Sequence, residues 1–132
     1  MSKFAAAMYS LAGLAALLSV ALAALTAHAL ASIAPTGDQA VAWFREATAF
    51  QMSHALGLMI VTTVAERITG RAQRLMRAAC YLLLAATVLF PAALYSVSFN
   101  GPVFFAPFGG VSAMAGWALF GVAAWMARQP AE

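Results

Sequence analysis

Charged residues are scarce in this sequence. Its 132 residues include only seven Lys or Arg and four Asp or Glu, so that 8% of the chain is charged, whereas about 25% is usual for a soluble domain. A water-soluble protein of this size covers most of its surface with polar groups, and so few charges cannot do that. Because 64% of the residues are hydrophobic, we expect lipid, rather than water, to cover most of the surface.

The sequence also lacks the motifs of the common enzyme and metal-binding classes. Its single cysteine, Cys80, excludes an intrachain disulfide, and two histidines without a C-x-x-C motif do not predict a structural metal site. It contains no G-x-S-x-G, no phosphate-binding loop and no paired carboxylates inside an apolar run. We therefore expect no enzymatic activity and no cofactor.

Four apolar stretches are long enough to cross a bilayer, which takes about 20 residues for about 30 Å of hydrocarbon. They cover about residues 4–30, 41–65, 78–99 and 109–127. Turn-forming residues follow the first stretch at 35–38 and the third at 100–102. We expect an all-α fold, a four-helix transmembrane bundle that forms one domain over residues 1–132, with Asp38 as the N-cap of the second helix.

The basic residues are distributed unevenly between the two sides of such a bundle. With four spans, both termini and the connection between the second and third spans share one side. That side carries six basic residues, and the other side carries Arg45 alone. The six are Lys3, Arg67, Arg71, Arg74, Arg77 and Arg128. By the positive-inside rule, both termini and the arginine loop of residues 67–77 are expected in the cytoplasm, with the protein in a bacterial inner membrane.

Two other interpretations of the basic residues and of the first span are excluded. The arginines flank apolar runs instead of covering a polar surface, so they do not indicate a nucleic-acid partner. The first span follows Lys3 as a signal peptide would, but its apolar run is longer than the roughly 7 to 15 residues of a cleaved signal. We therefore expect it to remain as a membrane helix.

Small residues recur at intervals that suit helix packing in lipid, where close backbone contact and hydrogen bonds hold helices together. They are Ser19, Ala23, Ala27 and Ala31 in the first span, the alanine pairs 78–79, 85–86 and 92–93 in the third, and Gly109, Ser112, Gly116 and Gly121 in the fourth. We expect all three faces to pack within the bundle. Pro91 is expected to kink the third span near Thr87, whose hydroxyl would satisfy the freed carbonyl.

Polar residues inside a span are costly, so each needs a partner or a function. A candidate polar cluster lies in the second span and at the end of the first, and consists of His28, Arg45, Glu46, Gln51 and His54. Gln51 and His54 are three residues apart and so share a helix face. His54 lies about 8 to 10 Å deeper than His28, which argues against joint ligation of a haem or metal.

Two interpretations of this candidate polar cluster remain open. In the first, Gln51 and His54 form hydrogen bonds to neighbouring helices, and His28 caps the end of the first span. In the second, Arg45 and Glu46 close over a polar cavity that contains His54.

Four segments resemble one known family in their order and spacing: ALTAHAL, FREATAFQMSHALGL, LFPAALYSVSFNGP and APFGGVSAMAGWAL. The most specific pieces are His28 in A-H-A-L, Gln51-Met52-x-His54-Ala55-Leu56, Leu94-Tyr95 and Pro107-x-Gly109-Gly110. Over nearly the whole chain the sequence is similar to the YgdD-like family, the domain of unknown function 423. The resemblance implies a small four-helix inner-membrane protein and supplies no catalytic residues. The sequence departs from the family at Pro91 and Ala92, where small polar residues or glycine are usual.

The sequence favours a non-enzymatic accessory or structural subunit that packs against a larger membrane complex. The expected partners are the lipid bilayer and other membrane protein subunits. The alternative is a small transporter, or a lipid- or quinone-binding protein, that uses the polar cavity around His54.

Overall fold

The computed structural model describes residues 1–128, which form four long helices and one short one. The helices are α1 (Lys3–His28), α2 (Leu30–Ile33), α3 (Asp38–Ala65), α4 (Gly70–Ser98) and α5 (Ala106–Ala127). The four long helices are each apolar enough and long enough to cross a membrane. The predicted all-α class and the four predicted spans are confirmed.

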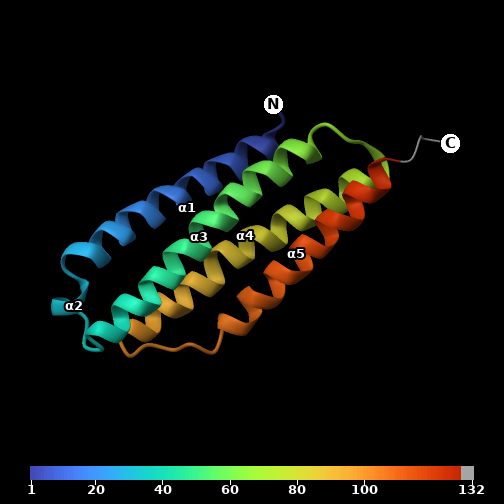
Figure 1. Ribbon diagram of the computed structural model, residues 1–132. Coiled ribbons are helices and arrows are strands. Elements are labelled where there is room, and N and C mark those ends of the chain that lie inside the picture. Colours follow the sequence, from blue (N-terminus) through green and yellow to red (C-terminus); the bar gives the residue numbers. More distant parts are fainter. Residues whose placement is uncertain (129–132) are drawn as a thin grey trace.

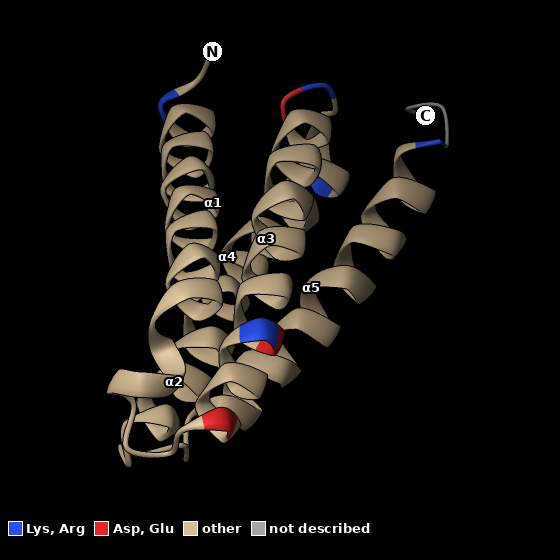
Figure 2. Ribbon diagram, turned by 60° about the vertical axis from the view of Figure 1, so that its left-hand side comes forward, with Lys and Arg blue, Asp and Glu red and all other residues tan. Residues whose placement is uncertain are grey.

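The long helices pack in the order α1, α3, α4, α5, so that α3 and α4 lie inside and α1 and α5 lie at the edges (Figure 1). The start of α1, the end of α5 and the α3–α4 connection lie at one end of the bundle, which we call the arginine end (Figure 1). The connections that contain α2 and residues 99–105 lie at the opposite end, which we call the Asp38 end. Figure 2 shows Lys and Arg concentrated at the arginine end, as the sequence predicted.

The arginine loop is shorter than expected. Of its four predicted members, only Arg67 lies in the connection between α3 and α4, because α4 begins at Gly70 and includes Arg71, Arg74 and Arg77. Arginine and alanine favour helices, so the helix continues outward past the apolar stretch. The charges nevertheless stay at the same end of the bundle.

The predicted N-cap at Asp38 is wrong. The cap position is Gly37, which has a φ of +54° and contributes no side-chain hydrogen bond, and Asp38 is the first helical residue. Glycine adopts this left-handed conformation at little cost, so the turn can bend the chain directly into α3. The Asp38 carboxylate lies in the first turn, where it still complements the helix dipole.

The face with which α1 packs against α3 differs from the predicted ladder of residues 19, 23, 27 and 31. Its buried residues follow a seven-residue pattern: Ala5, Met8, Ala12, Ala15, Ser19 and Thr26. Ala23, Ala27 and Ala31 are exposed. Each step of four residues rotates by about 40° around a helix of 3.6 residues per turn, so a ladder of this kind leaves the contact, whereas alternating steps of three and four stay on it.

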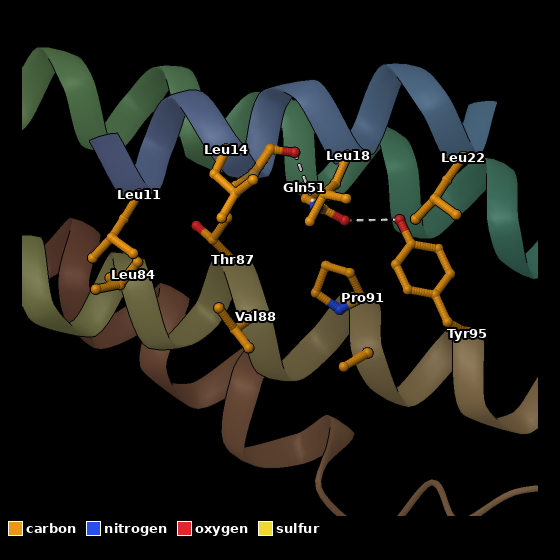
Figure 3. A pocket seen from close by; sticks show the side chains of 12 residues that line it. Leu11, Leu14, Leu18, Leu22, Gln51, Leu84, Thr87, Val88, Pro91 and Tyr95 are labelled. Carbon is orange, nitrogen blue, oxygen red and sulfur yellow. Dashed lines mark hydrogen bonds between the residues drawn. The ribbon is translucent and has the colours of Figure 1, made fainter. Parts of the chain in front are cut away.

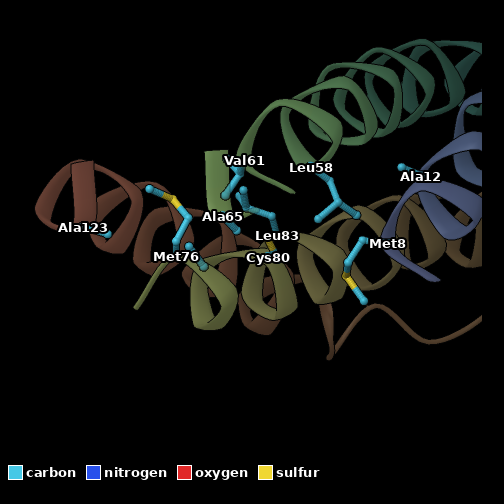
Figure 4. Packing of buried hydrophobic residues seen from close by; sticks show 10 residues of the cluster. Met8, Ala12, Leu58, Val61, Ala65, Met76, Cys80, Leu83 and Ala123 are labelled. Atoms are coloured by element: carbon cyan, nitrogen blue, oxygen red, sulfur yellow. The ribbon is translucent and has the colours of Figure 1, made fainter. Parts of the chain in front are cut away.

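The predicted alanine seam on α4 is confirmed for the second alanine of each pair, while Ala78, Ala85 and Ala92 are partly exposed. Ala79, Ala86 and Ala93 are fully buried, and their interval of seven keeps them on one face. Ala79 belongs to a core cluster in which Leu58 of α3 and Leu83 of α4 are fully buried (Figure 4). This core lies in the half of the bundle nearer the arginine end.

Two glycines of α5 allow its close approach to α4. A Cβ at Gly109 would lie 2.5 Å from the backbone nitrogen of Phe90, and a Cβ at Gly116 would lie 3.0 Å from the side chain of Leu83. A Cβ at Gly121, in contrast, would have no atom of the described residues within 4 Å. The predicted glycine face therefore packs at 109 and 116 but not at 121.

Pro91 lies inside α4, which continues through it from Gly70 to Ser98. The hydroxyl of Thr87 donates to the carbonyl of Leu83 at 2.7 Å, so it does not satisfy its own carbonyl, the one that Pro91 leaves without a donor. The predicted role for this hydroxyl is wrong, because a threonine in a helix reaches backwards by one turn.

The two connections at the Asp38 end are joined to each other. The hydroxyl of Thr36, which precedes α3, donates to the carbonyl of Ser98 at the end of α4 at 2.7 Å. This bond ties the α1–α3 hairpin to the α4–α5 hairpin at that end.

Candidate functional site

Gln51 joins three helices in the middle of the bundle. Its amide nitrogen donates to the carbonyl of Ala15 on α1 at 2.9 Å, and its amide oxygen accepts from the hydroxyl of Tyr95 on α4 at 2.8 Å. The side chain is buried. A buried amide in an apolar bundle must find such partners, and Gln51 thus fixes the spacing of α1, α3 and α4 at this level.

A cavity of about 290 Å³ lies between α1 and α4, and Gln51 of α3 lines it (Figure 3). One wall consists of leucines of α1, and the other is formed by α4, including Thr87, Pro91 and Tyr95. The dashed lines in Figure 3 mark the two hydrogen bonds of Gln51, which lies near the middle of the cavity between Leu14 and Leu18. Leu14 and Val88 on the rim are 52% and 55% exposed, so the cavity opens to the surface between the two helices.

Tyr95 is held in place by aromatic packing as well as by Gln51. Its ring centroid lies 4.6 Å from that of Phe44, and Phe44 in turn contacts Phe99 at 6.3 Å. Sequence reasoning did not identify Tyr95 as a site residue. Its occurrence in the Leu94-Tyr95 motif was the available signal, but its pairing with Gln51 depends on a contact between two helices.

His54 faces a different neighbour from Gln51. Its Nε2 accepts from the indole nitrogen of Trp117 on α5 at 3.3 Å, and its Nδ1 lies 2.9 Å from the carbonyl of Phe50. These bonds fit the neutral imidazole with the proton on Nδ1. The ring also stacks on Phe50 at 3.9 Å. His54 therefore links α3 to α5, while Gln51 links α3 to α1 and α4.

Gly57, one turn from His54, makes room for this contact. A Cβ at Gly57 would lie 2.8 Å from the ring of Trp117. The absence of a side chain lets the indole cross α3 and reach the imidazole. Neither Gly57 nor Trp117 was identified from the sequence.

The other members of the candidate polar cluster do not join Gln51 and His54. His28, Arg45 and Glu46 are exposed, and none of them lines the cavity. The cavity between α1 and α4 is lined by Gln51 and not by His54, Arg45 or Glu46. The hydrogen-bonding interpretation of Gln51 and His54 agrees with the structure, but no hydrogen bond between His28 and the end of α1 occurs in the part of the chain that the structure describes.

Helical geometry explains why Gln51 and His54 contact different helices. Gln51 and His54 are 300° apart along the helix, so their side chains diverge by about 60°. In an arrangement where α3 has α1 and α4 on one side and α5 on another, that divergence is enough to give the two residues different partners.

At the arginine end, Glu66 connects the start of α1 to α4. Its carboxylate accepts from the backbone N–H of Ser2 at 3.3 Å and lies 3.5 Å from Arg77. Hydrogen bonding from Ser2 is the largest of the effects that lower the pKa of Glu66 from its usual 4.5, and Arg77 adds to it. The guanidinium of Arg77 also lies 4.9 Å from the ring centroid of Phe4. The predicted cytoplasmic arginines thus include one with a packing role.

Within residues 1–128, no group of three or more His, Cys, Asp or Glu side chains is placed to hold a metal ion. The polar side chains described above in the membrane-spanning region are the amide of Gln51, the imidazole of His54 and several hydroxyls. Such groups position helices or an uncharged ligand by hydrogen bonding.

Comparison with known proteins identifies the family. A family model described as "Protein of unknown function (DUF423)" matches residues 22–110, which include His28, Gln51, His54 and Tyr95. The chain is also 33% identical over 114 residues to the UPF0382 membrane protein YwdK of Bacillus subtilis (strain 168), and the alignment covers 83% of this chain and 88% of that protein. No solved structure matches the chain. The matched segment exceeds half of the chain and agrees with the resemblance found in the sequence, and this protein therefore belongs to the DUF423 family of membrane proteins.

Proposed function

We propose that this protein is a non-enzymatic accessory or structural subunit of a larger membrane complex. It crosses the bacterial inner membrane four times, with both termini in the cytoplasm. The observation that carries the proposal is a surface of alanines on α2 and on the half of α1 nearer to it, which is exposed in the part of the chain that the structure describes.

The alanine surface consists of Ala21, Ala23, Ala24 and Ala27 of α1 and Ala31 of α2, all of them exposed. In lipid, apolar helices gain nothing from the hydrophobic effect when they associate, and small residues favour contact because they let backbones approach closely. The bundle uses this device itself at Gly109 and Gly116. A second helix could approach the alanine surface in the same way.

The position of α1 supports the same proposal. Only 17% of its most apolar 18-residue window is buried, compared with 44% for α3. As an edge helix, α1 packs mainly against α3. Its remaining surface is open to a helix of another subunit.

The assembly proposal is tested by bulky substitutions on the alanine surface. We expect the wild-type protein, extracted in mild detergent, to migrate with a larger assembly on native gels. Ala24→Phe and Ala27→Phe should release it as a lone chain, because each phenylalanine would hold a partner helix away. Ala118→Phe, at an exposed position of α5, is the matched control and should leave the assembly intact.

Two results would contradict this proposal. One is a wild-type protein that runs as a monomer or a homo-oligomer in several mild detergents. The other is an assembly that tolerates Ala24→Phe and Ala27→Phe as well as it tolerates the control.

The orientation is supported by the charge distribution between the two ends of the bundle. Six of the seven basic residues of the sequence belong to the arginine end, which the positive-inside rule assigns to the cytoplasm. A reporter fused after Glu132 should be active only if that reporter functions in the cytoplasm. Activity of a periplasm-specific reporter at the same position would reverse the proposed orientation.

A second candidate function is a small transporter, or a lipid- or quinone-binding protein. The observation that favours it is the cavity between α1 and α4, which lies at Gln51 and Tyr95 instead of at His54.

A further inference from the structure

We propose that the cavity between α1 and α4 binds a neutral lipid, meaning a hydrocarbon chain with an uncharged carbonyl- or hydroxyl-bearing head group, and that Gln51 and Tyr95 bind the head group. This inference deepens the second candidate function, and it does not depend on assembly through the alanine surface. It rests on the shape of the cavity, the position of Gln51 and Tyr95 in its lining, and its lack of charge.

The cavity is elongated along the helices. Its lining on α1 runs from Leu11 to Leu22 and on α4 from Leu84 to Tyr95, and eleven residues of helix span about 16 Å. A volume of about 290 Å³ spread over that length makes a narrow slot instead of a rounded pocket. Such a slot suits a single hydrocarbon chain that lies parallel to the helices.

The lining is apolar toward the Leu11 end, and its amide and phenol lie between its middle and the Leu22 end. Leu11 of α1 faces Leu84 of α4, whereas Gln51 lies between Leu14 and Leu18 and Tyr95 lies toward Leu22 (Figure 3). A chain in the slot would thus place an attached head group against Gln51 and Tyr95. The polarity of the cavity matches the polarity of an amphiphile.

Gln51 and Tyr95 retain hydrogen-bonding capacity after their mutual contact. The amide nitrogen of Gln51 carries two hydrogens, and among the described residues it has one acceptor, the carbonyl of Ala15. The hydroxyl oxygen of Tyr95 uses its hydrogen toward Gln51 and keeps its acceptor capacity. Hydrocarbon cannot satisfy these groups, and each unsatisfied group in it is costly. A carbonyl oxygen would accept from Gln51, and a hydroxyl would in addition donate to Tyr95.

The α4 wall offers one more acceptor. Pro91 lacks an N–H, so the carbonyl of Thr87 lacks the usual donor four residues later. Both residues line the cavity. Thr87 lies eight residues before Tyr95, about 12 Å along α4, so this acceptor is available to a polar group further along the slot and not to one bound at Tyr95.

The absence of charge in the lining restricts the head group. No Asp, Glu, Lys, Arg or His contributes to the cavity. A phosphate, carboxylate or ammonium group at Gln51 would therefore be a buried charge without a counter-ion, which is strongly unfavourable. Gln51 also lies 13 residues after Asp38 in α3, about 20 Å from that end of the helix, so a charge at Gln51 would lie deep within the spanning segment. Quinones and neutral glycerides both have an uncharged head group with carbonyl or hydroxyl oxygens, so the cavity fits either ligand.

The test uses ligands with matched ten-carbon chains added to the full-length protein in an uncharged detergent. The ligands are a decyl-substituted benzoquinone, monodecanoylglycerol, decanoate and decane. The readout is the shift of the thermal unfolding midpoint as a function of ligand concentration, since a ligand that binds the folded state raises it. We expect a saturable increase with the quinone or the glyceride and none with decanoate or decane.

Three variants connect the shift to the cavity. Leu18→Trp should fill the slot and abolish the shift, while Leu17→Trp, on the neighbouring residue that faces outward and does not line the cavity, should preserve it. Gln51→Leu should weaken binding by about tenfold, the effect of one lost hydrogen bond in an apolar site. Far-ultraviolet circular dichroism establishes that each variant is folded before binding is compared.

The pattern of shifts distinguishes a quinone from a glyceride as the ligand, and it distinguishes a failure of head-group recognition from a failure of the site. A shift with only the quinone assigns the cavity to quinones, and a shift with only the glyceride assigns it to glycerides. An equal shift with decane would overturn head-group recognition, and an equal shift for wild type and Leu18→Trp would overturn the site. No shift with either uncharged amphiphile would overturn the whole inference, while leaving the assembly proposal to its own gel experiment.

Discussion

The two edge helices are held to the inner pair in different ways. Between α1 and α3, side chains form hydrogen bonds: Ser19 donates to the carbonyl of Thr48 at 2.8 Å, and the hydroxyls of Tyr9 and Thr63 lie 2.8 Å apart. Between α4 and α5, no side-chain hydrogen bond occurs among residues 1–128. Glycines there let the backbones approach instead.

This difference has a physical consequence in lipid. Interhelical hydrogen bonds in a membrane contribute on average about 0.6 kcal/mol each, so the α1–α3 contact depends on several small contributions that can be lost singly. Close packing of two helix backbones requires that no side chain lies between them. Adding one carbon at such a contact therefore costs more stability than losing one interhelical hydrogen bond. The α4–α5 contact should thus tolerate substitution less well than the α1–α3 contact.

The largest expected effect is that of Gly109→Ala. The added Cβ would lie 2.5 Å from the backbone nitrogen of Phe90 and 2.9 Å from its Cα, and backbone atoms cannot move aside as a flexible side chain can. We expect a loss of about 1–3 kcal/mol in the free energy of unfolding. Denaturation by sodium dodecyl sulfate in mixed micelles, followed by circular dichroism, measures it.

Gly110→Ala is the matched control for this prediction. Gly110 is the next residue of α5, and a Cβ there would have no atom of the described chain within 4 Å. This variant should be as stable as the wild type or slightly more stable, since alanine is more favourable than glycine in a helix by up to about 1 kcal/mol. Equal destabilisation at 109 and 110 would show that helix propensity, and not the contact with Phe90, governs the α4–α5 interface.

A smaller effect is expected at the hydrogen bonds of Gln51. Gln51→Leu removes the bonds to α1 and α4, and Tyr95→Phe removes only the second. A double-mutant cycle of the two substitutions should give a coupling of about 0.6–1.7 kcal/mol, measured by the same denaturation. A coupling of zero would mean that the Gln51–Tyr95 bond, which joins the two inner helices, contributes nothing to stability, and any loss in Gln51→Leu would then have to come from elsewhere.

The smallest effect is expected at Glu66, which joins α1 to the inner helices at the arginine end. Its pKa is lowered in the folded protein, so its contribution to stability is present above the ordinary value of 4.5 and is lost as the pH falls through the folded value. Thermal unfolding midpoints of wild type and Glu66→Gln should thus converge between pH 6 and pH 3. A difference that stays constant over this range would exclude the carboxylate as its source. These pH values are about 1.5 units on either side of the ordinary pKa.

The four spans, and the end of the bundle that carries the basic residues, could be predicted because they depend on the local sequence alone. Four apolar lengths and seven basic residues fix how often the chain crosses the bilayer and which connections share an end. The alanine seam of α4 was predictable for a related reason, since an interval of seven identifies a face without reference to any partner.

The partners of the polar residues could not be predicted in this way. Gln51 and His54 occupy one side of α3, yet the first meets Ala15 and Tyr95 and the second meets Trp117. Which neighbour a side chain meets depends on the order of helices around α3, and composition does not specify that order. The cavity likewise depends on how far α1 and α4 are separated, which no single segment determines.

The bond between Thr36 and Ser98 has a consequence for the order in which the protein forms during translation. The two residues are 62 positions apart. At roughly 5–20 residues per second, a ribosome needs about 3–12 s to add that length of chain. The second span is added within this interval, and from its completion at Ala65 until Ser98 arrives the first two spans form a pair whose loop is not yet fastened to the third.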